Sequence, residues 1–368
     1  MDLDYSFQKT YTLIPQSPLI HFQYDQSGAT LRATEVKPKL DRYIINRYKR
    51  EHNGADIPED WKIPNTPEGK TALKYQMRIR AIGVIKTLEL GRHTDYEIYY
   101  ANMGDNLKKG VWAENKLEIS CMIPSLLDAI HSFINGFFVV SNFGTMQDKG
   151  FGCYTIKEGE SLTDSDIANL LKSEYDCKKC YMITGRTQKE LFRNIRVIYN
   201  TLKAGNAFSP KTDSILFRYM DKKYHIKSEK DWLKKRASAS QAKYVRALLG
   251  IGDHMGPVNR PTTVQHTILK LKKAGKDING AQPIERVPSP IWFTVYDNKA
   301  FYVSRKIPEI IYGAEFDFDS SDRRLNSGRL RVPDSAVIGQ AFLDNFLDFA
   351  YKQFKTMKQI KFITVSEV

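Results

Sequence analysis

The hydrophobic and polar positions of this sequence follow two periods, and their succession predicts strands and helices that alternate along the chain. Residues 7–22 have the pattern of a strand that ends in a polar turn, and residues 34–48 have one apolar stripe at helical spacing. A further helix is predicted to open at Pro124, and residues 153–156 are predicted to form a strand. Residues 75–90 fit either a strand or a helix.

The second half of the chain repeats this alternation. Helices are predicted from Asp164 onward, over residues 189–202 and over residues 336–357, because apolar residues recur there every three or four positions. Asp297 and Asn298 separate two short apolar stretches, which is the composition of a β-hairpin.

The alternation predicts an α+β protein made of two related units. We expect a first domain over residues 1–157 and a second domain, with helical and basic insertions, over residues 158–368. The apolar run near residues 133–140 is much shorter than the roughly 18 residues of a membrane span. The N-terminal segment carries acids and no apolar run, so we expect a cytoplasmic protein with reduced cysteines.

Charge narrows the choice of partner. The chain has 56 Lys and Arg against 42 Asp and Glu, a formal net charge of +14. Such a surplus favours a polyanion, because each neutralised phosphate releases condensed counterions. A basic surface that only keeps the protein soluble is the alternative. The basic residues gather in two segments: residues 32–50 hold seven against two acids, and residues 222–246 hold nine against two.

The first basic segment has the donors of an anion site. A threonine hydroxyl, the N–H groups of a helix N-terminus and nearby cations all favour a phosphate. The candidates are Arg32, Thr34, Lys37, Lys39 and Arg42. A solvated helix face with an ordinary N-cap is the alternative. The second basic segment, predicted as a helix followed by a mobile loop, adds the candidates Arg236, Lys243 and Arg246.

A glycine-rich segment, residues 142–152, follows the helix that opens at Pro124. It matches neither the Walker A loop nor the GxGxxG pattern of dinucleotide folds. Its glycines allow the backbone to approach a ligand closely, and its N–H groups are predicted to cradle a sugar-phosphate chain. An ordinary glycine-containing connection fits equally well. The candidates are Gly144, Gln147, Lys149, Gly150, Phe151 and Gly152.

Three short stretches of the chain occur in an order typical of one family. They are LRATEVK at 31–37, KGFG at 149–152 and RVPSPI at 286–291. Together they resemble the RAMP superfamily of CRISPR-associated RNA-binding proteins, and their placement is most similar to the first subunit of the type III-B (Cmr) effector complex.

This resemblance implies two ferredoxin-like (RRM-like) βαββαβ units whose sheet and glycine loop face RNA. It implies contacts to backbone and phosphate rather than base stacking, because the family lacks aromatic stripes. The implied partners are guide RNA, target RNA and other RAMP subunits, with no cofactor and no membrane. The residues implied to contact RNA are Arg32, Lys37 and Arg42 in the helix block and Lys149, Gly150 and Gly152 in the loop.

Catalysis is the alternative that the same resemblance raises. Some superfamily members process guide RNA as metal-independent endoribonucleases, with a histidine acting at the scissile 2′-OH. His21 would be that general base here. The long stretch after the glycine loop favours a non-catalytic subunit instead. A single CxxC at Cys177 and Cys180 does not supply the four ligands of a zinc site, so no metal is expected.

Overall fold

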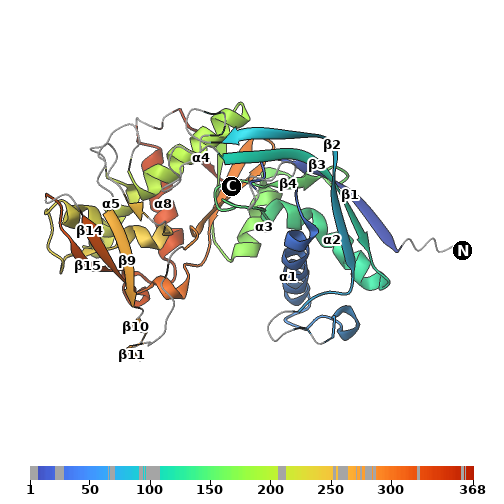
Figure 1. Ribbon diagram of the computed structural model, residues 1–368, viewed down its shortest axis with the longest axis horizontal. Helices are drawn as coiled ribbons and strands as arrows, with labels where there is room; N and C mark the ends of the chain where they lie inside the picture. Colours follow the sequence, from blue (N-terminus) through green and yellow to red (C-terminus); the bar gives the residue numbers. More distant parts are fainter. Residues whose placement is uncertain are drawn as a thin grey trace, which may run out of the picture.

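Figure 1 shows the computed structural model of the chain, in which two lobes lie side by side. The structure describes residues 7–20, 29–64, 66, 71–90, 94, 96, 108–205, 213–251, 254–255, 264–270, 272–273, 276–277, 284, 287–320, 324–357, 360 and 362–368. The candidate general base His21 lies outside the described residues.

The first lobe is a βαββαβ unit. In chain order its elements are β1 (Gln8–Pro15), α1 (Ala33–Glu51), β2 (Gln76–Leu90), β3 (Lys108–Ser120), α2 (Pro124–Val140) and β4 (Tyr154–Ile156), with a short 3-10 helix η1 (Glu59–Trp61) after α1. The strands are antiparallel in the order β2-β3-β1-β4. A βαββαβ chain path with β3 between β1 and β2 is the ferredoxin-like arrangement.

A second βαββαβ unit repeats this order. Its elements are β5 (Cys180–Thr184), α4 (Gln188–Lys203), β12 (Ile291–Tyr296), β13 (Lys299–Ser304), α8 (Phe342–Phe354) and β16 (Val365–Glu367). Its antiparallel sheet has the order β12-β13-β5-β16. The predicted α+β fold of two related units is therefore confirmed. The predicted domain boundary after residue 157 lies between β4 and the linking helix α3 (Asp164–Tyr175), and it stays a prediction.

Two insertions interrupt the second unit. The first contains α5 (Ile215–Tyr224), β6 (Lys227–Ser228), α6 (Glu229–Leu233), β7 (Ala242–Lys243), η2 (Val245–Leu249), β8 (His254–Met255), β9 (Val264–Lys270), β10 (Lys272–Lys273) and β11 (Lys276–Asp277). The second contains η3 (Glu309–Ile311), β14 (Glu315–Ser320), β15 (Gly328–Arg331) and α7 (Ser335–Ile338). Strands from both insertions form one sheet, β15-β14-β9-β8, whose larger strands lie at the left of Figure 1.

The core of the first unit lies between its sheet and the helices α1, α2 and α3. The predicted apolar stripe of α1 is buried there, with Val36, Leu40 and Ile44 fully covered. Burying this stripe stabilises the helix by far more than its own backbone propensity does. The polar stripe of α1 therefore remains outside the core.

Three sequence predictions are resolved or corrected by the fold. Residues 76–90, left open between strand and helix, form β2. The predicted long helix over 336–357 is wrong, because Gly339 has a φ of +76° and separates α7 from α8. The predicted helix and mobile loop over 222–246 is also wrong: the charged residues are distributed over the short elements α5 to η2. Among the helices of the described ranges, none is both long and apolar enough to cross a bilayer.

Candidate nucleic-acid interface

The polar stripe of α1 faces the glycine loop and carries three of the six cations of the helix. Side chains that are three or four residues apart lie on one face of a helix. This stripe contains Glu35, Lys39, Arg42 and Arg50. Arg42 and Arg50 are exposed, and so is Arg32, which occupies the N-cap in extended conformation. Thr34 was predicted near the N-cap and lies, exposed, in the first turn.

The glycine loop, residues 142–152, lies directly against this stripe. The Gly144 N–H donates to Glu35 Oε1 at 2.7 Å. Lys39 Nζ donates to the Asn142 carbonyl at 2.8 Å and to Gln147 Oε1 at 3.0 Å. Burial lowers the pKa of Lys39, against the opposing effect of Glu35, and the nearby Arg42 lowers it further. The structure thus joins the helix block and the loop, two regions about one hundred residues apart.

The glycines of this loop permit close packing inside the protein. Gly144 and Gly152 have φ values of +76° and +70°. A Cβ would lie 2.4 Å from the Ile20 carbonyl oxygen at the first position and 1.9 Å from the Phe143 carbonyl oxygen at the second. The N–H of Gly150 donates to Gln147 O, and the N–H of Gly152 donates to Pro18 O. At these glycines the predicted cradle of N–H groups for a phosphate is therefore not formed.

Lys149 points into the second unit. Its Nζ lies 2.6 Å from Asp148 Oδ2 and 3.6 Å from the centre of the Tyr199 ring, and its side chain is only 16% exposed. Burial alone would lower the pKa of Lys149, but Asp148 and Tyr199 outweigh it and raise the pKa. The same carboxylate accepts the Ser289 N–H at 3.2 Å. Asp148 thus links the loop to the segment before β12, and Lys149 pairs with the same carboxylate.

Asn142 positions the loop, and sequence reasoning missed this role. It is buried, and its Nδ2 donates to the Gln147 carbonyl at 2.6 Å and to the Phe293 carbonyl at 2.7 Å. Phe151 also packs inside, with its ring centroid 4.6 Å from that of Phe192. The only signal in the sequence is an asparagine at the start of a glycine-rich loop. This signal does not reveal that the side chain is buried or which carbonyl groups it contacts.

Of the remaining candidates, one lies in α1 and three lie in the first insertion of the second unit. Lys37 is half-buried and donates to Asp41 Oδ2 and to the Leu73 carbonyl, each at 2.9 Å, so it holds α1 to the chain before β2. In the second unit, Arg246 pairs with the fully buried Glu229, whereas Arg236 is exposed and Lys243 is half-buried on β7. Figure 1 places this segment, drawn in yellow, in the other lobe from α1.

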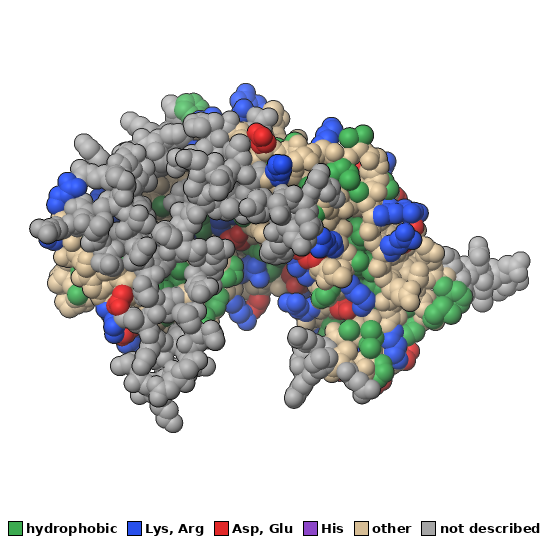
Figure 2. Space-filling view, in the orientation of Figure 1, with side chains coloured by type: hydrophobic (Ala, Val, Ile, Leu, Met, Phe, Trp, Pro, Cys, Tyr) green, Lys and Arg blue, Asp and Glu red, His purple; other side chains and the backbone are tan. Residues whose placement is uncertain are grey.

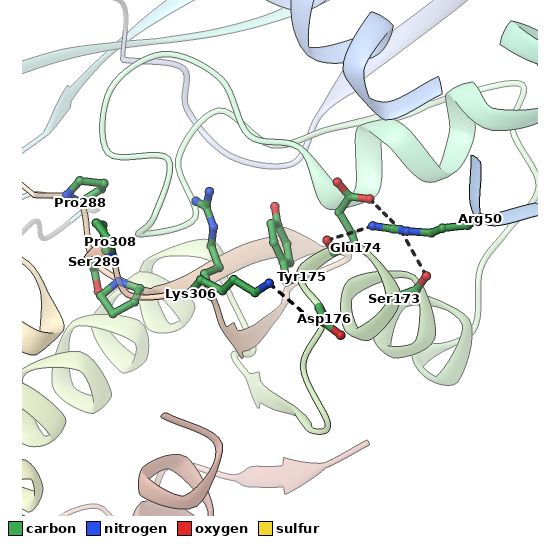
Figure 3. Close-up of a pocket in the computed structure, with 11 residues that line it drawn as sticks. Arg50, Ser173, Glu174, Tyr175, Asp176, Pro288, Ser289, Lys306 and Pro308 are labelled. Atoms are coloured by element: carbon green, nitrogen blue, oxygen red, sulfur yellow. Dashed lines mark hydrogen bonds and ion pairs between the residues drawn. The ribbon is translucent and has the colours of Figure 1, made fainter. Parts of the chain in front are cut away.

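A pocket opens at the end of the α1 stripe, where the two units meet. Its volume is about 560 Å³, and Figure 3 shows its lining residues. It is lined by Arg50, by residues 173–176 at the end of α3, and by Pro288, Ser289, Pro290, Arg305, Lys306 and Pro308 around the hairpin β12–β13. Arg305 and Lys306 were not among the predicted site residues, because nothing near them in the chain indicates that they approach α1.

Figure 2 shows that Lys and Arg side chains gather near the notch between the lobes, interspersed with acidic ones. The positive charge of Arg305 contributes to lowering the pKa of Lys39. Arg305 is therefore close enough to the α1 stripe to interact with it electrostatically. We call the exposed or half-exposed cations Arg32, Arg42, Arg50, Arg305 and Lys306 the basic face. A row of cations on one surface is the electrostatic footprint of a nucleic-acid partner.

Metal chemistry has no support in the described residues. Within them, no group of three or more His, Cys, Asp or Glu side chains is placed to hold an ion. Burial raises the pKa of the Cys177 thiol to about 11 and that of the Cys180 thiol to about 12. These thiols are therefore protonated near neutral pH, which disfavours a nucleophilic role.

Comparison with known proteins identifies the family. The Cmr1 N-terminal domain model matches residues 6–206, and the Cmr1 C-terminal domain model matches residues 211–366. The chain is also similar to the crystal structure of apo Cmr1 from Pyrococcus furiosus, at 10% identity and a TM-score of 0.44, covering 98% of each chain. No curated protein matches the sequence. Because the two family models span nearly the whole chain, it belongs to the Cmr1 family, a subunit family of the type III-B CRISPR effector complex.

Proposed function

We propose that this chain is a non-catalytic RNA-binding subunit of a type III CRISPR effector complex. It binds guide RNA, target RNA or both through the basic face beside the glycine loop. The observation that carries this proposal is the alignment of Arg32, Arg42 and Arg50 along one side of α1, all exposed. Exposed guanidinium groups bind phosphate oxygens without needing a particular base sequence.

The glycine loop supports the proposal by holding α1 in place. The side chains of Glu35 and Lys39 are hydrogen-bonded to the loop backbone. These bonds hold α1, and the exposed cations along its stripe, in a defined position.

Fluorescence anisotropy with a labelled, unstructured RNA tests the binding. We expect the logarithm of the association constant to fall linearly with the logarithm of salt concentration, by about 0.7 for each phosphate neutralised. Three to four contacts would give a slope of about −2 to −3. Absence of binding even at low salt would refute the proposal and leave a scaffold that contacts only proteins.

The non-catalytic part is tested separately with repeat RNA in EDTA. We expect the RNA to stay intact during prolonged incubation with the purified chain. Site-specific cleavage that is lost in His21→Ala would instead establish a metal-independent ribonuclease. Co-purification with other RAMP subunits tests the assembly part of the proposal, since a complex subunit must contact its neighbours through surfaces outside the basic face.

A further inference from the structure

We propose that the pocket at the end of α1 holds a single nucleotide of the bound RNA, with its base inside and its phosphate at the rim. This inference rests on the proposed function, because the RNA strand supplies the nucleotide. The pocket volume of about 560 Å³ lies within the range of about 300 to 1,000 Å³ that is usual for small-molecule sites.

Part of the pocket wall suits a flat aromatic ring. Tyr175 and three prolines line it. The Arg305 guanidinium lies 4.6 Å from the centre of the Trp292 ring and 5.1 Å from that of Tyr175, so stacking holds it in place. Unpaired RNA bases bind by stacking on aromatic rings and on Arg guanidinium planes. A base that enters the pocket therefore finds a rigid platform.

The charges at the pocket suit a nucleotide better than a free anion. Lys306 is 86% exposed at its side chain, and Arg50 is 38% exposed, so both have access to a phosphate. Two carboxylates also line the pocket: Glu174, which pairs with Arg50 at 3.3 Å, and Asp176, which lies 3.8 Å from Lys306. They repel a bare anion but accept hydrogen bonds from ribose hydroxyl and base amino groups. Figure 3 shows both pairs.

The pocket is continuous with the basic face through shared residues. Arg50 belongs to the α1 stripe and also lines the pocket. Ser289 lines the pocket wall, and its N–H is bound by Asp148 of the glycine loop. An RNA backbone that follows α1 toward its C-terminal end is thus led to the pocket mouth.

Calorimetric titration of the full chain with AMP, ribose 5-phosphate and inorganic phosphate tests the inference. We expect AMP to bind more tightly than the other two probes, because only AMP offers a base to stack. Unlabelled single-stranded RNA should displace AMP. Arg305→Lys keeps the charge but removes the planar group and should weaken AMP binding about tenfold, whereas Lys306→Ala should weaken it about threefold.

Lys352→Ala is the matched control, because Lys352 is 70% exposed on α8 and also pairs with an acid, Asp348. It should leave AMP binding unchanged. Equal affinities for AMP and phosphate, or equal effects of Lys306→Ala and Lys352→Ala, would overturn the assignment of the pocket to a nucleotide. The proposed binding of RNA by α1 would be unaffected by either result. AMP binding that RNA does not displace would also overturn the inference. Loss of RNA binding altogether, with AMP still bound, would refute the proposed function.

Discussion

The two basic segments of the chain, α1 and residues 222–246, resemble each other in charge but differ in how the fold uses them. In α1 the exposed cations Arg32, Arg42 and Arg50 follow one stripe beside the glycine loop. In residues 222–246 the cations are spread over short elements, and Lys230 and Arg246 are mostly buried in ion pairs with Asp213 and Glu229. Net charge makes both segments candidates, and we place the proposed interface on α1 because its exposed cations follow one stripe.

The largest expected effect concerns the loop that holds α1. Gly152→Ala places a Cβ 1.9 Å from the Phe143 carbonyl oxygen, so the backbone must move, and we expect a loss of about 4 kcal/mol or more in stability. Gly54→Ala is the matched control, because Gly54 has a φ of +86° with no atom within 4 Å of the added Cβ. It should cost only about 1 kcal/mol. Urea denaturation of both variants measures the difference.

The second prediction concerns the other segment. Arg246→Ala leaves the Glu229 carboxylate, which is 0% exposed, without its partner, so we expect a loss of about 3 kcal/mol in unfolding free energy. The neighbouring Lys243→Ala should change stability by less than about 0.5 kcal/mol. An Arg246→Ala variant with unchanged stability but weakened RNA binding would contradict the comparison, since Arg246 would then serve the ligand.

The third prediction compares the segments directly as RNA contacts. Arg32→Ala combined with Arg42→Ala should weaken RNA binding about tenfold and reduce the salt slope by about 1.4, because two phosphate contacts are lost. Lys234→Ala combined with Arg236→Ala removes the same charge from exposed positions of the second segment. We expect about a twofold loss from that pair, through the general field alone. Equal losses in the two double variants would show that only net charge matters.

The smallest effect on RNA affinity is expected from a cation of α1 itself. Lys37→Ala leaves the Asp41 carboxylate, whose side chain is 5% exposed, without its ion pair and should lower stability by about 3 kcal/mol. RNA affinity should stay unchanged, because this side chain faces the chain before β2 and not the glycine loop. A tenfold loss of RNA affinity with full stability would place Lys37 on the basic face after all.

Much of the fold was predictable because local patterns carry it. The apolar stripes of α1 and α2, and the hairpin at Asp297 and Asn298, whose φ values are +47° and +56°, form as predicted. Gly339 was less predictable, since a single glycine inside an apolar helical pattern is often tolerated. The candidate site was half predictable: the helix block and the glycine loop do meet, but Arg305 and Lys306 join them only through the packing of the second unit.

The sequence by itself determined most helices and strands of the two βαββαβ units and the surplus of positive charge, because these depend on composition and on neighbours within a few residues. The tertiary structure decided which cations are exposed, which are buried against acids, and which distant residues line one pocket. These outcomes depend on desolvation and on pairing across more than one hundred residues, as between Lys39 and Gln147, and no local pattern encodes them.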